Sequence, residues 1–382
     1  MNKKVMLFSR DPGGANTVAP LYKKLINKGY DVILYGKDAA LNKYNQYGLH
    51  GGDINTKLHC ISQDEVYKFL LQESPDFLIT GTSADDFTEK YLWKAAERLN
   101  IKSFAILDQW VNYGVRFSKY SVNELEKYNI NKIHPYLPYK ILAMDEYAKK
   151  QIINEGISKE KILVSGQPYF DYLIEKQQYL NKDEIYKLRK ELCENKDEVI
   201  ITYVSEPISK VYNENDSSQH YWGYTERTIF KQLFYVLNKI SDDYKINIKL
   251  IIRLHPKEDE NNYSDIIDDI HSKYISILTD KRIDGFNLMF VSDLICGMSS
   301  MFLIEAAIIG KPIVSMQMGL KRENPFILDK KGILKSVLSE EDLKKRLKNI
   351  LVEHKIENGS FKVEKGAVGK VIEYMEALIC QF

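Results

Sequence analysis

The sequence predicts an α/β protein with two domains, each built around a parallel sheet. Short apolar runs alternate with longer helical patterns in the first half, and a second series of the same kind begins at Val199. This alternation is typical of parallel strands joined by crossover helices. A length of 382 residues also exceeds one comfortable core. We therefore expect two Rossmann-like domains whose sheets face each other across a cleft.

The predicted strands are short and rich in apolar residues, and helical patterns separate them. In the first half they cover residues 5–9, 31–35, 77–80, 103–107, 141–143 and 162–165. In the second half they cover residues 199–204, 249–254, an apolar run that begins at 290 and ends at 296, and 313–316. Helices are predicted over residues 17–28, 88–99, 228–241 and 264–272, and directly after Ser300.

A polar, charge-rich stretch over residues 175–197 separates the two series. We place a linker there, so that residues 1–174 form the first domain and residues 198–365 the second. The tail, residues 366–382, carries apolar side chains at helical spacing. It is expected to form a helix with one packed face. Periodicity does not decide on which domain this helix packs.

An anion-binding site is predicted where the apolar run stops at Gly297. Ser299 and Ser300 follow it at the start of a helix, where free backbone N–H groups and the helix dipole favour a phosphate. Glu305 falls in the second turn, where its carboxylate can accept both hydroxyls of a ribose. The alternative is an ordinary crossover whose serines only cap the helix.

A second polar cluster ends the strand at residues 249–254. It consists of Arg253, His255 and Pro256. Ligands of open α/β sheets gather beyond the carboxyl ends of the strands, so this cation and imidazole should face the same crevice as the serines. We expect them to neutralise a leaving nucleotide without a metal ion, because no paired-acid metal signature ends a strand. A turn with a satisfied imidazole is the alternative.

The loop Asp11 to Asn16, with sequence DPGGAN, follows the first strand. Gly13 and Gly14 allow positive φ and a close approach of the backbone to a ligand, so these residues and Asn16 are candidates for binding an acceptor sugar. Asp11 is the second candidate for a general base. A plain tight turn capped by Asn16 is an equal alternative.

The first candidate for the base is Asp108, which begins the segment DQWVNYGVRF. A transferase needs a group that accepts the proton of the acceptor hydroxyl. Trp110 offers a flat face for a sugar ring, and Asn112 and Arg116 offer polar contacts. The competing interpretation is a loop whose Trp110 and Phe117 belong to the core.

A long polar loop over residues 205–227 follows the first strand of the second domain. Loops of this length are often lids or binding loops, and Glu206, His220, Tyr224 and Arg227 are candidates for contacting the donor or the acceptor. The alternative is a solvent loop.

Composition excludes some partners. A formal net charge of +1 gives no pull toward nucleic acid and at most a peripheral association with a membrane. The four cysteines have no metal or disulfide spacing, and the start is too short in apolar residues for a signal peptide. We expect a cytoplasmic protein with no bound cofactor or metal.

The motifs together resemble a known superfamily. The segment GISKEKILVSGQPYFDYL at 156–173 is similar to the passage that ends the first domain of GT-B glycosyltransferases and of non-hydrolysing UDP-N-acetylglucosamine 2-epimerases. RLHP at 253–256 and GMSS at 297–300 resemble the His-Pro and Ser-Ser/Thr motifs of bacterial sialyltransferases, polysialyltransferases and CDP-glycerol-type transferases. In those families the His and the Ser pair hold the donor phosphate. The sialyltransferase-like acidic motif would correspond to Asp108, with Gln109 and Trp110 in place of its second acid and glycine.

The resemblance implies a GT-B enzyme that uses a nucleotide-activated sugar. Our main hypothesis is an inverting, metal-independent glycosyltransferase acting on a surface glycan or glycoprotein, with a CMP-activated nonulosonic acid as the favoured donor. A UDP-hexose donor stays open through Glu305. The alternatives are a 2-epimerase-like isomerase of nucleotide sugars and a CDP-glycerol-type polyol-phosphate transferase.

Overall fold

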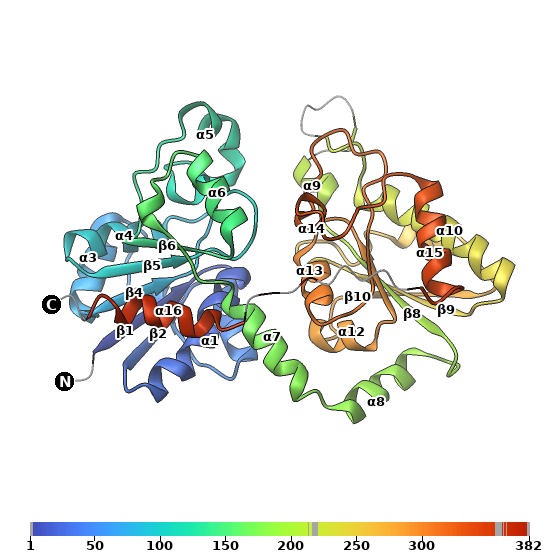
Figure 1. Cartoon of the computed structure of the whole chain (residues 1–382), viewed down its shortest axis with the longest axis horizontal. Helices are drawn as coiled ribbons and strands as arrows, with labels where there is room; N and C mark the ends of the chain where they lie inside the picture. Colours follow the sequence, from blue (N-terminus) through green and yellow to red (C-terminus); the bar gives the residue numbers. More distant parts are fainter. Residues whose placement is uncertain are drawn as a thin grey trace. The chain divides into compact units, whose positions relative to one another are not determined.

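The computed structural model describes residues 3–212, 214–215, 221–355, 361, 363 and 365–379. It divides the chain into two compact units, Met1–Glu175 with Val363–Phe382, and Lys176–Lys362. Each unit is an α/β fold around one parallel sheet (Figure 1). The prediction of an α/β protein with two parallel sheets is therefore confirmed.

The first unit holds a seven-stranded sheet in the order β3-β2-β1-β4-β5-β6-β7. Its strands are β1 (Lys4–Ser9), β2 (Asp31–Gly36), β3 (Gly52–Asp53), β4 (Phe77–Thr80), β5 (Lys102–Ile106), β6 (Lys140–Ala143) and β7 (Ile162–Val164). Its helices are α1 (Pro12–Asn27), α2 (Ala39–Gln46), α3 (Gln63–Glu73), α4 (Thr88–Arg98), α5 (Leu125–Asn131), α6 (Glu146–Asn154), the start of α7 (Pro168–Gln178), and α16 (Ala367–Glu376). Strand order reverses between β1 and β4, which makes the carboxyl ends of these two strands the switch point of the sheet.

The segment DPGGAN is not the loop that the sequence predicts, because α1 already begins at Pro12. Proline suits the first helical position, where its missing N–H is no loss. Gly13 and Gly14 therefore lie in the first turn, and neither has a positive φ. Their lack of a side chain serves close packing instead, since a Cβ on Gly14 would come within 3.3 Å of the Gly81 Cα.

The C-terminal helix α16 packs on the first unit, beside α1 (Figure 1). Val371, Ile372 and Met375 are fully buried in the core that covers this face of the sheet. The carboxylate of Asp171 on α7 accepts the N–H groups of Gly366 and Val368 at 2.9 Å each, so it caps the start of α16.

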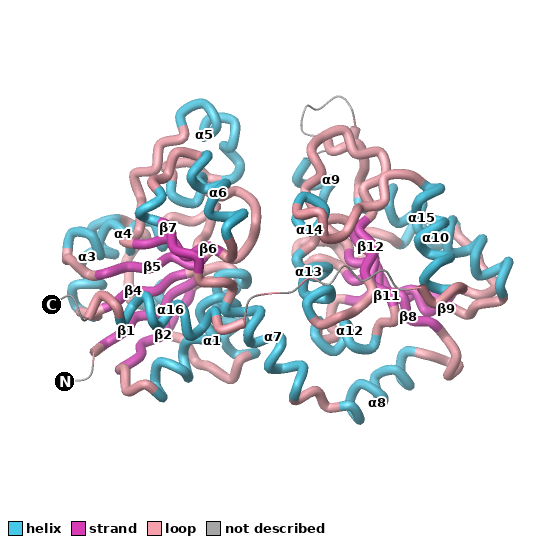
Figure 2. The backbone as a smooth tube through the Cα atoms, viewed as in Figure 1, coloured by secondary structure: helices cyan, strands magenta, loops and turns pink. Residues whose placement is uncertain are grey.

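The second unit holds a five-stranded sheet in the order β10-β9-β8-β11-β12. Figure 2 shows the strands of this unit in magenta with helices around them. Its strands are β8 (Val199–Val204), β9 (Ile248–Arg253), β10 (Ile275–Asp280), β11 (Leu294–Gly297) and β12 (Ile313–Ser315). Its helices are α8 (Lys182–Leu192), α9 (Ile208–Tyr212), α10 (Glu226–Tyr244), α11 (Ser264–Asp269), α12 (Gly285–Val291), α13 (Met301–Ile308), α14 (Ile327–Lys330) and α15 (Glu340–Leu351). The switch point lies between β8 and β11. The predicted strand begins at Phe290, but Phe290 belongs to α12. The observed strand β11 begins four residues later, at Leu294.

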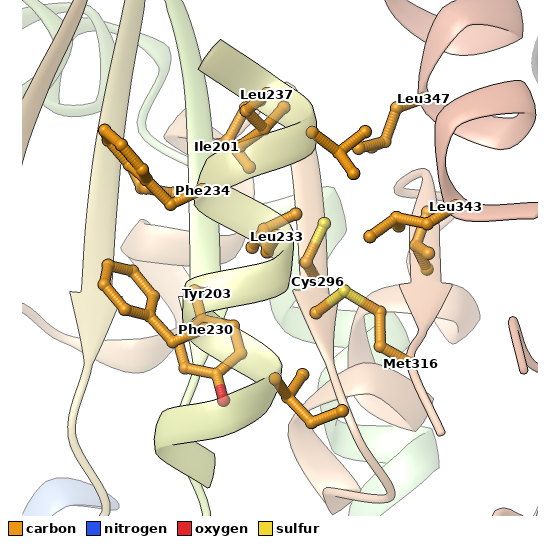
Figure 3. Close-up of a cluster of buried hydrophobic side chains, with 14 of the residues drawn as sticks. Ile201, Tyr203, Phe230, Leu233, Phe234, Leu237, Cys296, Met316, Leu343 and Leu347 are labelled. Carbon is orange, nitrogen blue, oxygen red and sulfur yellow. The ribbon is translucent and has the colours of Figure 1, made fainter. Parts of the chain in front are cut away.

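One face of this second sheet carries the larger core. Apolar side chains of α10 and α15 pack on the strands there (Figure 3). Residues labelled in that view include Tyr203, Phe230, Leu233, Cys296 and Leu343. The other face is covered by α8 and α12. In the described part of the chain, no helix combines the length and the apolar character needed to cross a membrane.

Replacing Asp171 tests the cap on α16. In Asp171→Ala the N–H groups of Gly366 and Val368 lose their acceptor, so the free energy of unfolding should fall by about 1 kcal/mol. Asp171→Asn keeps an acceptor oxygen and should lose less. Denaturant titration measures both values, and hydrogen exchange should show faster exchange confined to α16. Equal stability of Asp171→Ala and the wild type would contradict this role.

Candidate functional site

Two loops meet at the switch point of the second sheet, one after β8 and one after β11. Glu206 lies on the first, and Ser299 lies on the second. The Ser299 N–H donates to Glu206 Oε1 at 2.7 Å, and the Ser299 Oγ donates to Oε2 at 3.0 Å. The structure therefore brings together two residues that the sequence assigns to the donor site.

The carboxyl group of Glu206 lies where a phosphate was predicted, at the start of α13. Burial raises the pKa of Glu206 to about 7, although hydrogen bonds from Ser299, Ser300 and the Met298 backbone act in the opposite direction. Ser300 caps α13 by accepting the N–H of Phe302 at 3.2 Å. The capping role considered as an alternative is thus present in the structure.

His255 follows β9 and has one defined tautomer. Its Nδ1 accepts the N–H of Lys257 at 3.1 Å, which leaves the proton of the neutral ring on Nε2. Burial, together with the positive charges of Lys257 and Lys281, lowers the pKa of His255 to about 4. The ring is therefore a neutral hydrogen-bond donor at pH 7. Glu258 fixes the backbone here by accepting the His255 N–H at 2.7 Å.

Arg253, the last residue of β9, is paired within its own unit. Its Nη1 donates to Asp280 Oδ2 at 2.6 Å. Asp280 ends β10, which pairs with β9, and its carboxylate also accepts the N–H groups of Arg282 and Ile283. The positive charge that the sequence assigns to this strand end is therefore offset by an aspartate.

The other predicted donor residues also belong to the second unit. Pro256 follows His255 in the turn after β9. Gly297 ends β11, and a Cβ there would come within 3.1 Å of the Val204 carbonyl oxygen. Glu305 lies half-buried in the second turn of α13.

The segment 205–227 is not free of regular structure, because it contains α9. The hydroxyl of Tyr224 donates to Gln317 Oε1 in the interior. Arg227 is bound to Asp265 and to the Asn262 carbonyl oxygen. His220 lies outside the described residues.

In the first unit Asp108 follows β5 and is tied to Arg116. The Arg116 Nη1 donates to Asp108 Oδ1 at 2.8 Å, and the two side chains are 2% and 10% exposed. The same nitrogen donates to Thr82 O and Oγ1 at 2.6 and 2.8 Å, and Nε donates to Asn112 O at 3.1 Å. The pKa of Asp108 is raised above its usual value. Burial is the main cause, the positive charge of Arg116 acts against it, and the negative charge of Asp11 raises the pKa as well.

The second oxygen of Asp108 touches the α1 helix start. A Cβ built on Gly13 would come within 2.0 Å of Asp108 Oδ2, so only glycine fits there. Asp11 directly precedes this helix and pairs with Arg10 at 2.8 Å. The loops after β1, β4 and β5 therefore converge on Asp108.

Two predicted acceptor-binding side chains, those of Trp110 and Asn16, have contacts within the first unit. Trp110 is 7% exposed, stacks on Phe170 and donates its indole N–H to Asp145 at 2.8 Å. Asn16 Oδ1 accepts the Tyr47 hydroxyl proton at 2.9 Å. Asn112 adopts a positive φ of 54°. Both Trp110 and Phe117 are buried, as the packing interpretation of this loop requires.

Sequence reasoning missed Glu89, which is fully buried beside these loops. A signal was available: Glu89 precedes Leu92 and Trp93 by three and four residues, which puts it on the apolar face of α4. Among the described residues, no three His, Cys, Asp or Glu side chains are grouped so that they could hold a metal ion.

Two Rossmann-like units, with polar groups at the carboxyl ends of their parallel strands, define a GT-B-like fold. The chain belongs to the CDP-Glycerol:Poly(glycerophosphate) glycerophosphotransferase family, whose profile matches residues 120–365. The resemblance to CDP-glycerol-type transferases is confirmed. The chain is thus a transferase of this family.

Solved structures of 2-epimerases share the fold. The UDP-GlcNAc 2-epimerase from Methanocaldococcus jannaschii has a TM-score of 0.68 and 16% identity, over 98% of this chain and 99% of that chain. The Neisseria meningitidis enzyme bound to UDP-GlcNAc gives 0.63 and 16%, over 98% and 100%. A putative 2-epimerase from Listeria monocytogenes gives 0.70 and 14%, over 100% and 98%. At these identities the likeness shows the fold alone. No curated protein sequence matches the chain.

The ion pair between Asp108 and Arg116 can be tested by its pH dependence. Arg116→Ala leaves a buried carboxylate without its cation, which should cost about 3 kcal/mol of unfolding free energy at pH 7. The pKa of Asp108 in the folded variant should rise further, so folding takes up a proton and the deficit should shrink as the pH falls toward about 4, the pKa of an unfolded aspartate. Denaturant titrations at several pH values measure this. In a control, Arg98→Ala should show no such trend, and a pH-independent deficit in Arg116→Ala would contradict the assignment.

The state of His255 can be read by NMR. We expect its imidazole to stay neutral, with the proton on Nε2, down to a pH of about 4. Its ring resonances should therefore not move between pH 8 and pH 5, while an exposed histidine titrates near 6.5. Lys257→Met should raise the pKa of His255, because one of the charges that lower it is removed. A wild-type His255 that titrates between pH 6 and 7 would contradict the structure.

Proposed function

We propose that this chain transfers glycerol phosphate, or a closely similar polyol phosphate, from a CDP-activated donor to a hydroxyl group of a growing cell-surface polymer. The family match over residues 120–365 carries the proposal. The matched region includes the carboxyl ends of β8, β9 and β11, after which Glu206, His255 and Ser299 follow in the chain. The nonulosonic acid donor of our main hypothesis has no comparable support, so the polyol-phosphate alternative takes its place.

The reaction exchanges a phosphoanhydride bond for a phosphate ester bond. The acceptor hydroxyl oxygen forms a bond to the phosphorus that carries the polyol. The bond from that phosphorus to the bridging oxygen breaks, and CMP leaves with the electron pair. The hydroxyl proton goes to a base, for which Asp108 is our first candidate and Asp11 the second.

The second unit would hold the donor through hydrogen bonds. The neutral His255 can donate a hydrogen bond from its Nε2–H to a phosphate oxygen as CMP departs. The start of α13 carries serine hydroxyls and N–H groups that Glu206 accepts in this structure and that a phosphate would compete for, and Glu305 is suited to accept ribose hydroxyls. Arg253 would add less net charge than its type suggests, since Asp280 offsets it.

The first unit would hold the acceptor. Gly13 and Gly14 bring the start of α1 against the loops that carry Asp108. Asn16 in α1 and Asn112 in the loop after β5 would offer side-chain amide groups to the acceptor. Arg116 holds Asp108 through a hydrogen bond, and Trp110 packs on Phe170 and so anchors the loop that connects Asp108 with Arg116.

An assay with defined donors tests the proposal. With CDP-glycerol and a poly(glycerol phosphate) acceptor, we expect CMP release and chain extension that both depend on the acceptor. CMP-N-acetylneuraminate should not replace CDP-glycerol as donor. Turnover of UDP-N-acetylglucosamine without an acceptor, and none of CDP-glycerol, would overturn the proposal in favour of an isomerase.

Two substitutions examine the donor site. His255→Ala should lower kcat about 100-fold by removing the phosphate hydrogen bond, and Ser300→Ala should lower activity with a modest loss of stability, because it also removes a helix cap. Ser339→Ala is the matched control, since Ser339 caps α15 in the same way and should retain activity. Near-normal turnover in both site variants would remove this donor-site assignment.

A further inference from the structure

Glu89 is a buried acid at the start of a helix in the first unit. It lies in the first turn of α4, and the residue is 1% exposed. Within the described residues no lysine or arginine forms an ion pair with it. The guanidinium of Arg10 is bound to Asp11 and Asp38, and the ammonium of Lys90 is bound to backbone carbonyl oxygens of Val115 and Tyr120.

The carboxyl group of Glu89 connects the two loops at the switch point of the first sheet. The N–H of Ser83, after β4, donates to Glu89 Oε2 at 3.0 Å. A hydrogen bond from the backbone of Arg10, after β1, reaches the same carboxyl group. Glu89 therefore lies behind both loops that contact Asp108.

From these loops the contacts continue to Asp108. The carbonyl and hydroxyl oxygens of Thr82, the neighbour of Ser83, accept hydrogen bonds from Arg116. Arg116 in turn donates a hydrogen bond to Asp108 Oδ1. On the other side, the helix start after Arg10 places Gly13 against Asp108 Oδ2. A shift of either loop would move one of the two Asp108 oxygens.

The charges around Glu89 are mostly negative. Asp11 follows β1, and Asp86 precedes α4 and pairs with Lys37 at 2.5 Å. Burial raises the pKa of Glu89 to about 8, and Asp11 and Asp86 raise it too. Tyr44 on α2 is neutral, because burial raises its pKa far above 10. Lys90, the next residue on α4, has its own pKa lowered to about 8 by burial.

We propose that Glu89 is a positioning residue, which as a neutral carboxyl group joins the two loops that hold Asp108 and leaves the negative charge of this site on Asp108. This inference rests on the proposed function, in which Asp108 accepts the acceptor proton. An ionised Glu89 would repel Asp11 and Asp86 across a buried space and loosen both loops. The hydrogen bonds from Ser83 and Arg10 need only an acceptor oxygen, which a glutamine also has.

The conservative and the truncated variants should therefore behave differently. Glu89→Gln keeps the acceptor oxygen and cannot ionise, so kcat/KM at pH 7 should stay within about twofold of the wild type. Glu89→Ala leaves the N–H of Ser83 without its partner, so kcat/KM should fall at least tenfold. Glu97→Gln, on the exposed side of the same helix, is the control and should match the wild type.

The pH profile separates positioning from simple packing. Above pH 8 the wild type should lose about tenfold in kcat/KM per pH unit as Glu89 ionises, and Glu89→Gln should lack this alkaline limb. A limb that persists unchanged in Glu89→Gln would belong to Lys90 or another group, and it would overturn the proposal. Equal activity of Glu89→Ala and Glu89→Gln would overturn it as well.

A readout without turnover keeps the inference independent of the reaction. Folding raises the pKa of Glu89 from its usual value to about 8. Between pH 4.5 and pH 8 the folded protein therefore keeps a proton on Glu89 that the unfolded chain has already released. The unfolding free energy of the wild type should therefore fall relative to Glu89→Gln as the pH rises through that window. A constant difference would overturn the neutral carboxyl group. If this difference changes as expected but CDP-glycerol is not turned over, the proposed function fails and the neutral Glu89 stands.

Discussion

In each unit a buried carboxyl group ties together the two loops that flank the switch point of the parallel sheet. Glu89 does so between the loops after β1 and β4, and Glu206 between the loops after β8 and β11. Parallel sheets create this need, because the loops that leave the strand ends carry N–H groups that are no longer paired in the sheet and need an acceptor. Burial disfavours the charged form of both acids, whereas hydrogen bonds from N–H donors favour it. Burial dominates, and the pKa of each is raised.

The sequence was sufficient for the fold and for the strand-end side chains. Apolar runs such as residues 77–80 and 199–204 match β4 and β8, because a strand buried on both faces must be apolar throughout. The contact between Glu206 and Ser299 joins two residues that the sequence placed in one site. Local pattern could find each of these residues, since each directly follows an apolar run.

Partners distant in the chain could not be found in this way. Asp280 offsets Arg253 because β10 pairs with β9, and strand pairing is not written in either segment. Lys281, whose charge lowers the pKa of His255, directly follows Asp280 and is equally distant from His255 in the sequence. The helix start at Pro12 was missed for a local reason, since two glycines read as a turn although Asp108 and Gly81 require them for close packing.

The proposed donor side of the second unit therefore offers hydrogen bonds more than net charge. Arg253 is offset by Asp280, and His255 is neutral, so the unpaired charge near the imidazole comes from Lys257 and Lys281. A phosphate that binds the start of α13 must also meet Glu206. With the usual pKa of about 4.5, neutralising such an acid at pH 7 would cost about 3 kcal/mol. With the pKa of Glu206 raised to about 7, the same step costs less than about 1 kcal/mol. The burial that disfavours the carboxylate thus makes the helix start accessible to a competing anion.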